Sequence, residues 1–344
     1  MVINLYFVFE TILKNNFIYY IMSNYIDNKT LFSSPKVSQY NNHMVMTNVV
    51  RQTKTKYLNI DTKFCDEYVN NRLNSGLSNY NIANYTITLP YRINDVKSIT
   101  VLNIEIPMTY YNISSAIGNN CFNIKKDSYS FTIIIPDGQY DKTTLVTTIN
   151  TLLSSQTTNL GGVLSFGIFS NNISYLNFNG QGNINIDFAV DNYGSFDKYN
   201  FKYKLGWILG YRMVEYIVIG NNNINIVSSD CVLSESVFNL NVFKYFYLAI
   251  DEFSNGNQNS FISALFNSSI NKNIIAKISI DLQYYPYGSI LHATENLGLL
   301  MSDTRLYNNN TDIQKLNVQL LDENGNAVNL NGAEFSFGLK IEHE

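Results

Sequence analysis

The residues that most often perform catalysis are sparse in this sequence and stand far apart. Its histidines are His43, His292 and His343, and none lies in an H-x-x-x-H or facial-triad spacing that would hold a metal ion. Gly206 and Gly210 do not form the G-x-G-x-x-G loop that binds dinucleotide phosphates, and no Walker-type lysine or G-x-S-x-G nucleophile motif is present. We therefore expect no catalytic residue, no cofactor, no metal ligand and no enzymatic activity.

Three pairs of neighbouring carboxylates are the remaining candidates for acid–base chemistry: Asp66-Glu67, Asp251-Glu252 and Asp322-Glu323. Adjacent side chains of a strand point to opposite faces, so these pairs do not provide the facing carboxylates that a hydrolase needs. We interpret them as solvated turn residues, with a weak cation site in a loop as the alternative.

The cysteines give no framework either. Cys65, Cys121 and Cys231 are odd in number, far apart and without a C-x-x-C pair, which is typical of buried free thiols in a reducing compartment.

Charge is low and offers no surface for nucleic acid. Charged residues make up 15% of the 344 residues and the net charge is -4, so we expect no specific nucleic-acid partner. A modest basic cluster is formed by Arg51, Lys54, Lys56 and Lys63; it is either a phosphate or anionic-lipid contact or, as we prefer, the solvated entry to the first strand. A surface poor in charge and rich in Asn and Tyr suits contact with other proteins.

Alternating residues indicate antiparallel strands, most clearly near the end of the chain. Apolar residues alternate with polar ones over 316–320 and again over 335–341, and an Asn324-Gly325 turn signal lies between them. A period of two with one apolar face is typical of a half-buried antiparallel strand. We expect these strands to form a terminal hairpin whose Asn324-Gly325 turn is a contact loop.

Similar strand signals recur upstream at intervals of about ten residues, the spacing of sandwiches and barrels. Two of them end at Pro90 and Pro107, and the alternation slips between Val101 and Leu102, which predicts a β-bulge. The NGQG sequence at 179–182 predicts a hairpin turn. LGWILGY at 205–211 predicts a buried strand whose glycines allow close packing.

A helix is indicated at about 141–154. Asp141 can cap it, and Leu145, Ile149, Leu152 and Leu153 follow at helical spacing. Serial alternation of helices and strands is absent, which argues against a parallel α/β sheet and for an all-β fold.

Residues 1–50 are interpreted as an extended N-terminal arm that a partner orders. Its apolar part, 1–22, is interrupted by Glu10 and Lys14 and lacks a cleavage site, so it is neither a signal peptide nor an uncharged span. Its second part, 23–50, opens after Met22 and is polar and aperiodic. An overcalled start upstream of Met22 and a membrane-dipping helix over 1–22 are the alternatives.

Several short motifs, taken in their order along the chain, resemble a known family. They are YLNIDTKF at 57–64, NYTITLP at 84–90, IEIPMTYYN at 104–112, PDGQY at 136–140, LGWILGY at 205–211, and the terminal QKL at 314–316, LDENG at 321–325 and FSF at 335–337. Each is weak by itself, but their order over roughly residues 55–342 is similar to minor capsid and penton-type proteins of giant, nucleocytoplasmic large DNA viruses.

The resemblance implies a virion structural protein without enzymatic activity, assembled in the host cytoplasm into an icosahedral shell. It implies a jelly-roll-like antiparallel β-sandwich over residues 51–344. That length exceeds a minimal jelly roll and leaves room for an inserted or second β subdomain around 211–270. The expected partners are the major capsid protein, minor capsid neighbours and further copies of this chain, with the arm touching an inner membrane or scaffold protein.

Two other classes remain open. A receptor-binding or fibre-head module, or a glycan-binding β-sandwich of a virion, would share the strands and the aromatic residues. A β-sandwich hydrolase would need convergent carboxylates or a metal constellation, and the sequence shows neither.

Overall fold

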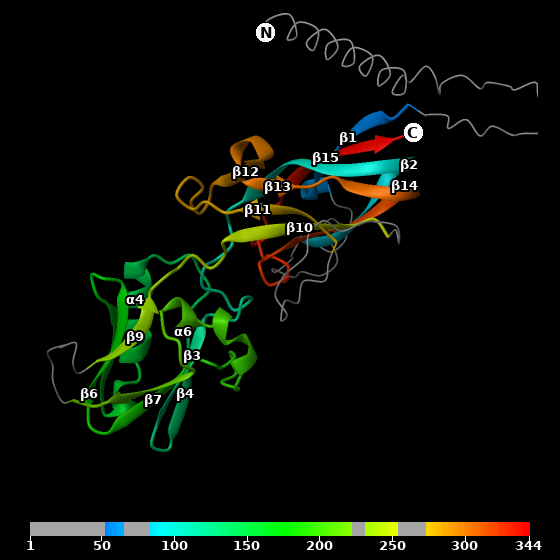
Figure 1. The fold of residues 1–344 in the computed structure, drawn as a ribbon. Coiled ribbons are helices and arrows are strands. Elements are labelled where there is room, and N and C mark those ends of the chain that lie inside the picture. The colour runs from blue at the N-terminus through cyan, green and yellow to red at the C-terminus, as the bar shows by residue number, and fades with distance from the viewer. Residues whose placement is uncertain (1–51, 65–82, 222–230, 254–272) are drawn as a thin grey trace, which may run out of the picture.

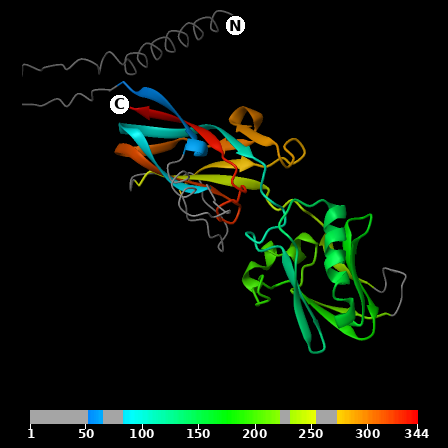
Figure 2. The same ribbon diagram turned by 180° about the vertical axis from the view of Figure 1, so that it is seen from behind.

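The chain forms two β units that are joined by two connecting segments (Figures 1 and 2). The computed structural model describes residues 52–64, 83–221, 231–253 and 273–344. The expected arm over 1–50 lies outside these residues, as do His43, Arg51, Cys65 and Asp66-Glu67. None of the helices among the described residues is long and apolar enough to cross a membrane.

The main unit contains both ends of the described chain and one curled antiparallel sheet. Its strands lie in the order β1-β15-β2-β14-β10-β11-β13, and β12 pairs with β2. Their bounds are β1 Lys54–Asp61, β2 Asn84–Pro107, β10 Tyr245–Asp251, β11 Ile274–Ser279, β12 Ile290–Thr294, β13 Leu300–Ser302, β14 Arg305–Leu321 and β15 Ser336–His343. Two short 3-10 helices, η1 (Thr62–Phe64) and η4 (Glu295–Leu297), follow β1 and β12.

The long strand β2 unites two stretches that the sequence had separated at Pro90. Proline removes a ladder hydrogen bond and is tolerated where the pairing is irregular. The pairing of β2 with β14 shifts register between Thr88 and Ile93, so Pro90 lies within an irregular stretch of the strand. The predicted bulge is confirmed: Gly338 pairs with Asn103 and Leu339 with Val101, which leaves Leu102 as the extra residue.

The two C-terminal strands are β14 and β15, but they do not form the expected hairpin. β2 lies between them and pairs with both. The prediction was wrong because the alternation specifies only which side chains face inward, whereas a long connection from Asp322 to Phe335 lets the last strand cross to the other side of β2.

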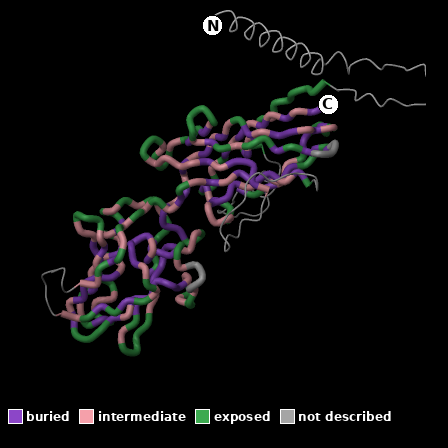
Figure 3. The backbone as a smooth tube through the Cα atoms, viewed as in Figure 1, coloured by how far each residue is buried: buried purple, intermediate pink, exposed green. Residues whose placement is uncertain are grey.

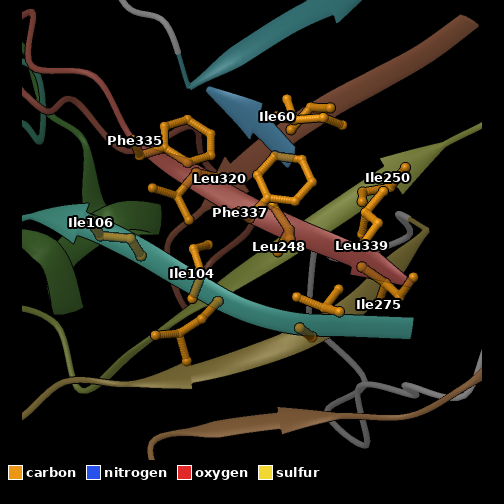
Figure 4. Close-up of a cluster of buried hydrophobic side chains, with 14 of the residues drawn as sticks. Ile60, Ile104, Ile106, Leu248, Ile250, Ile275, Leu320, Phe335, Phe337 and Leu339 are labelled. Atoms are coloured by element: carbon orange, nitrogen blue, oxygen red, sulfur yellow. The ribbon is translucent and has the colours of Figure 1, made fainter. Parts of the chain in front are cut away.

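The core of the main unit is made by the inward rows of these strands. Figure 4 shows side chains from β1, β2, β10, β11, β14 and β15 converging on Phe337, which is fully buried. Phe335 and Phe337 stack with ring centroids 6.2 Å apart. Burial of such large apolar side chains supplies most of the favourable free energy of folding.

The second unit is inserted between β2 and β10. It has a sheet of order β4-β3-β7-β8 and a sheet of order β5-β6-β9. The bounds are β3 Cys121–Lys126, β4 Tyr129–Ile134, β5 Gly162–Ile168, β6 Ile173–Gly180, β7 Asn183–Asp187, β8 Glu215–Ile219 and β9 Val232–Val237. Its helical segments are α4 (Lys142–Ser154), α5 (Thr157–Leu160), η2 (Lys198–Tyr203) and α6 (Leu205–Ile208).

The predicted helix is confirmed as α4. The Asp141 side chain accepts a hydrogen bond from the backbone N–H of Thr144, and the Thr144 hydroxyl accepts one from the backbone N–H of Asp141. This capping box satisfies donors that the first turn leaves without partners. Leu145, Ile149 and Leu153 form its buried face.

Two local predictions are corrected. LGWILGY is not a strand: Leu205–Ile208 is the short helix α6, and Gly206 lies so close to Phe188 that a Cβ would clash with its ring. The turn at 179–182 does not close a hairpin, because β6 and β7 belong to different sheets. Most of the LGWILGY residues are buried as expected, but apolarity alone does not distinguish a buried strand from a buried helix.

The fold class is therefore confirmed as an all-β, jelly-roll-like antiparallel fold with few helices. The described residues form two large hydrophobic clusters, one per unit. The buried members of the second cluster run from Ile113 to Val218, largely ahead of the range 211–270 in which the sequence left room for a subdomain.

Candidate assembly surface

The histidines of the described residues are not brought together. His292 lies on β12 with Nδ1 3.3 Å from Oε1 of Glu105. Glu105 also accepts hydrogen bonds from Ser336 and Asn103, so these residues form a polar cluster across β12, β2 and β15. His343 is buried near the end of β15. Within the described ranges no group of three or more His, Cys, Asp or Glu side chains could hold a metal ion.

The carboxylate pair Asp251-Glu252 is divided between two environments. Asp251 stays at the surface end of β10 and caps the backbone N–H of Phe253 at 2.8 Å. Glu252 is buried and forms an ion pair with Arg305, with 2.8 Å between Oε2 and Nη1. The prediction of solvated turn residues is therefore wrong for Glu252.

No pattern of residues in the sequence indicates a role for Arg305. It is 2% exposed, and besides Glu252 it donates to the carbonyl oxygens of Ile250, Asn273 and Ile274. One guanidinium thus joins the end of β10, the start of β11 and the start of β14. Its fixed fork of donors can satisfy several acceptors at once.

The pair Asp322-Glu323 stands at the turn that was expected to be a contact loop. Asp322 Oδ1 accepts from the backbone N–H of Asn324 and Asn326, at 2.8 and 2.9 Å, and so builds the turn. Burial raises the pKa of Glu323, while nearby Lys244 opposes the rise. Burial also raises the pKa of Tyr203 in the inserted unit, and the charges of Asp322 and Glu323 add to it. The turn therefore lies next to the chain's own second unit.

Cys121 is a free thiol, as expected. Cys121 is buried on β3, and burial raises the pKa of its thiol to about 11, although Lys204 opposes the shift. Cys231 is half-buried ahead of β9. Of the basic cluster, Lys54 and Lys56 lie exposed on β1 and Lys63 on η1.

Two of the family-like motifs meet where the chain enters the inserted unit. The Asn112 amide, at the end of IEIPMTYYN, donates to the carbonyl of Tyr140 at 2.7 Å and accepts from its N–H at 2.9 Å. Tyr140 ends PDGQY, and Asp137 of the same motif accepts from the N–H and the hydroxyl of Ser115, both at 2.7 Å. The two motifs therefore fix the junction of the two units.

The edge strands of the sheets differ in what protects them from pairing with another chain. The edge of β5 is covered by α4, because the Asn150 amide both donates to the carbonyl of Phe166 and accepts from its N–H, each at 2.8 Å. The edge of β1 bears Lys54 and Lys56, and lysines on an edge discourage pairing with another chain. β4 has neither protection.

Apolar side chains are exposed on both units. On the inserted unit, Ile217 and Ile219 alternate along the outer face of β8, while Tyr129 and Ile134 are exposed on β4. Exposed apolar side chains that gather on strands favour contact with other proteins over contact with water.

Comparisons with known proteins give a distant structural likeness. No protein-family model matches this chain, and no curated protein matches its sequence significantly. Among solved structures, the chain is similar to a mavirus penton protein, with 10% sequence identity and a TM-score of 0.41, over 86% of this chain and 100% of that one. A likeness of this size does not determine function.

Proposed function

We propose that this protein is a structural virion protein, a minor capsid or penton (vertex) subunit that assembles an icosahedral shell through strand edges, loops and its N-terminal arm. The single observation that carries the proposal is an uncharged strand edge, β4, left uncovered by the described residues, whereas α4 covers the edge of β5 and lysines lie on the edge of β1. Such an edge is a hazard for a protein that works alone and a contact for a subunit that neighbours complete.

The order of the family-like motifs supports the same proposal. Two of them meet at the junction of the two units, LGWILGY lies in the core of the inserted unit, and the others lie on or next to strands of the main unit. We propose that the protein has no enzymatic activity, that its partners are the major capsid protein, minor capsid neighbours and further copies of itself, and that it is assembled in the host cytoplasm. We also propose that the arm over 1–50 touches an inner membrane or scaffold protein.

The test is the location and copy number of the protein in purified particles. Quantitative mass spectrometry against the major capsid protein, combined with a reconstruction of the particle, should find it in the shell. A pentamer at each vertex would make it a penton, and many copies beneath the lattice would make it a minor capsid protein. Particles that lack it would refute the proposal.

A receptor- or glycan-binding module of a virion is the second candidate, and one observation favours it. Tyr111 and Tyr287 stack with ring centroids 6.3 Å apart, and Tyr284 nearby is exposed, an arrangement on which a sugar ring could lie. Binding on a glycan array that is lost on Tyr284→Ala and Tyr287→Ala, with unchanged thermal stability, would support it. A glycan array without signal would exclude the glycan-binding candidate and leave the proposal of a shell subunit.

A further inference from the structure

The outer edge of β4 offers unpaired backbone groups. The N–H of Ile135 donates to the carbonyl of Asn120 at 2.7 Å, and the register continues through Ile133 opposite Phe122. In an antiparallel ladder the hydrogen-bonded residues alternate. Ser130, Thr132 and Ile134 therefore direct their N–H and C=O groups away from β3.

No described segment occupies this edge. β4 is the terminal strand of its four-stranded sheet. The loop that carries Gly194 reaches the Thr132 side chain, but among the described residues no backbone hydrogen bond joins it to β4. Figure 3 shows that the hairpin of β3 and β4 ends in an exposed turn; β3 itself is mostly buried, whereas half of the residues of β4 are exposed.

The sequence of β4 favours pairing with another strand. YSFTII contains β-branched and aromatic residues, no proline and no charge. Tyr129 is 56% and Ile134 47% exposed. A row of backbone donors and acceptors on an uncharged strand is satisfied by one chemical partner, another extended strand.

We infer that the partner is β4 of a second copy of this chain, paired antiparallel about a twofold axis with Thr132 opposite Thr132 and Ser130 opposite Ile134. This register uses every free backbone group of Ser130, Thr132 and Ile134, and it joins the four-stranded sheets of two copies into one. The inference deepens the proposed function by naming a partner. That the pairing takes place in a capsid shell rests on the proposed function.

Cysteine cross-linking of the full-length protein tests the pairing, in a background with Cys65→Ser and Cys231→Ser. Facing residues of a hydrogen-bonded antiparallel pair have Cα atoms about 5.5 Å apart, within reach of a disulfide. Thr132→Cys should therefore give a covalent dimer under mild oxidation. Ser130→Cys is the matched control, because its counterpart lies four residues along the strand, about 13 Å away, and should not cross-link.

Two results would overturn the inference: no dimer from Thr132→Cys, or dimer formed as fast from Ser130→Cys. In the Thr132→Cys background, Ile134→Lys should lower the yield roughly tenfold, since it places a charge on the edge. Leu297→Lys, at a position 57% exposed on η4 of the main unit, should leave the yield unchanged. Equal effects of the two lysines would also overturn the pairing.

The outcomes separate this inference from the proposed function. Particles that contain the protein while Thr132→Cys stays monomeric would refute the pairing and leave the shell subunit intact. A specific cross-link in a protein that particles lack would refute the shell subunit and leave the pairing intact.

Discussion

Arg305 and Glu252 show how a buried ion pair can organise strand ends. Both side chains are almost fully enclosed, and the guanidinium reaches backbone carbonyls of two neighbouring strands. Removing charges from water is costly, so such a pair contributes mainly when every donor and acceptor has a partner. Arg305 meets that condition through its contacts with β10 and β11.

We predict that Arg305→Met destabilises the protein by about 3–5 kcal/mol, because Glu252 would remain buried and uncompensated. Arg305→Met combined with Glu252→Met should recover part of this loss, and Arg92→Met, at an exposed ion pair with Asp312, should cost less than about 1 kcal/mol. Urea unfolding curves measure all three. A single Arg305→Met variant as stable as the wild type would contradict the role of the pair.

Glu323 provides a pH-dependent prediction at the same scale. Because burial raises its pKa, the folded state holds the proton more tightly than the unfolded state does. The protonated Glu323 carboxyl favours the folded state fully at a pH below the pKa of Glu323 in the unfolded chain. This contribution is lost as the pH rises through the pKa of Glu323 in the folded protein. Glu323→Gln should therefore be more stable than the wild type at pH 7, with an advantage that disappears as the carboxyl protonates. Thermal unfolding from pH 3 to 8 checks this, and a variant less stable at pH 7 would contradict it.

At the scale of elements, the strand edges differ in what covers them. Helix α4 covers the edge of β5 through Asn150, exposed lysines lie on the edge of β1, and no described segment pairs with the outer edge of β4. The long strand β2 bridges both sides of the main sheet because its irregularities at Pro90 and Leu102 let it bend without losing its inward row.

Asn150→Ala should destabilise the inserted unit by about 1–3 kcal/mol, since it leaves both backbone groups of Phe166 without their partner. Thr147→Ala, on the exposed face of the same helix, is the control and should change stability by less than about 0.5 kcal/mol. Hydrogen exchange at the Phe166 amide should accelerate in the first variant alone. Equal protection in both would show that α4 does not hold this edge.

At the scale of the whole molecule, two hydrophobic cores lie in one chain. The inserted unit leaves the main unit after β2 and returns before β10, and the partly buried Val242 packs against both clusters. Units with separate cores can lose their structure separately.

Core truncations should therefore act locally. Leu339→Ala in the main core and Ile186→Ala in the inserted core should each cost about 2–5 kcal/mol. Hydrogen exchange followed by mass spectrometry should show lost protection mainly in the unit that carries the substitution. Uniform loss across both units would mean that the cores unfold as one.

The amino-acid sequence determined the local features of this protein. Alternation over 84–89, 99–106 and 335–341 indicated which side chains enter the main core, Asp141 marked the start of α4, and the phase slip predicted the bulge at Leu102. These features depend on residues that are close together in the sequence, so the pattern of residue types is enough to predict them.

Only the tertiary structure decided which strands pair and which polar side chains meet. The separation of β14 from β15 by β2, the helix in LGWILGY, the Arg305–Glu252 pair and the open edge of β4 all depend on segments far apart in sequence. A period of two assigns a face but not a neighbour, so the partner of each strand is set by the packing of the whole chain.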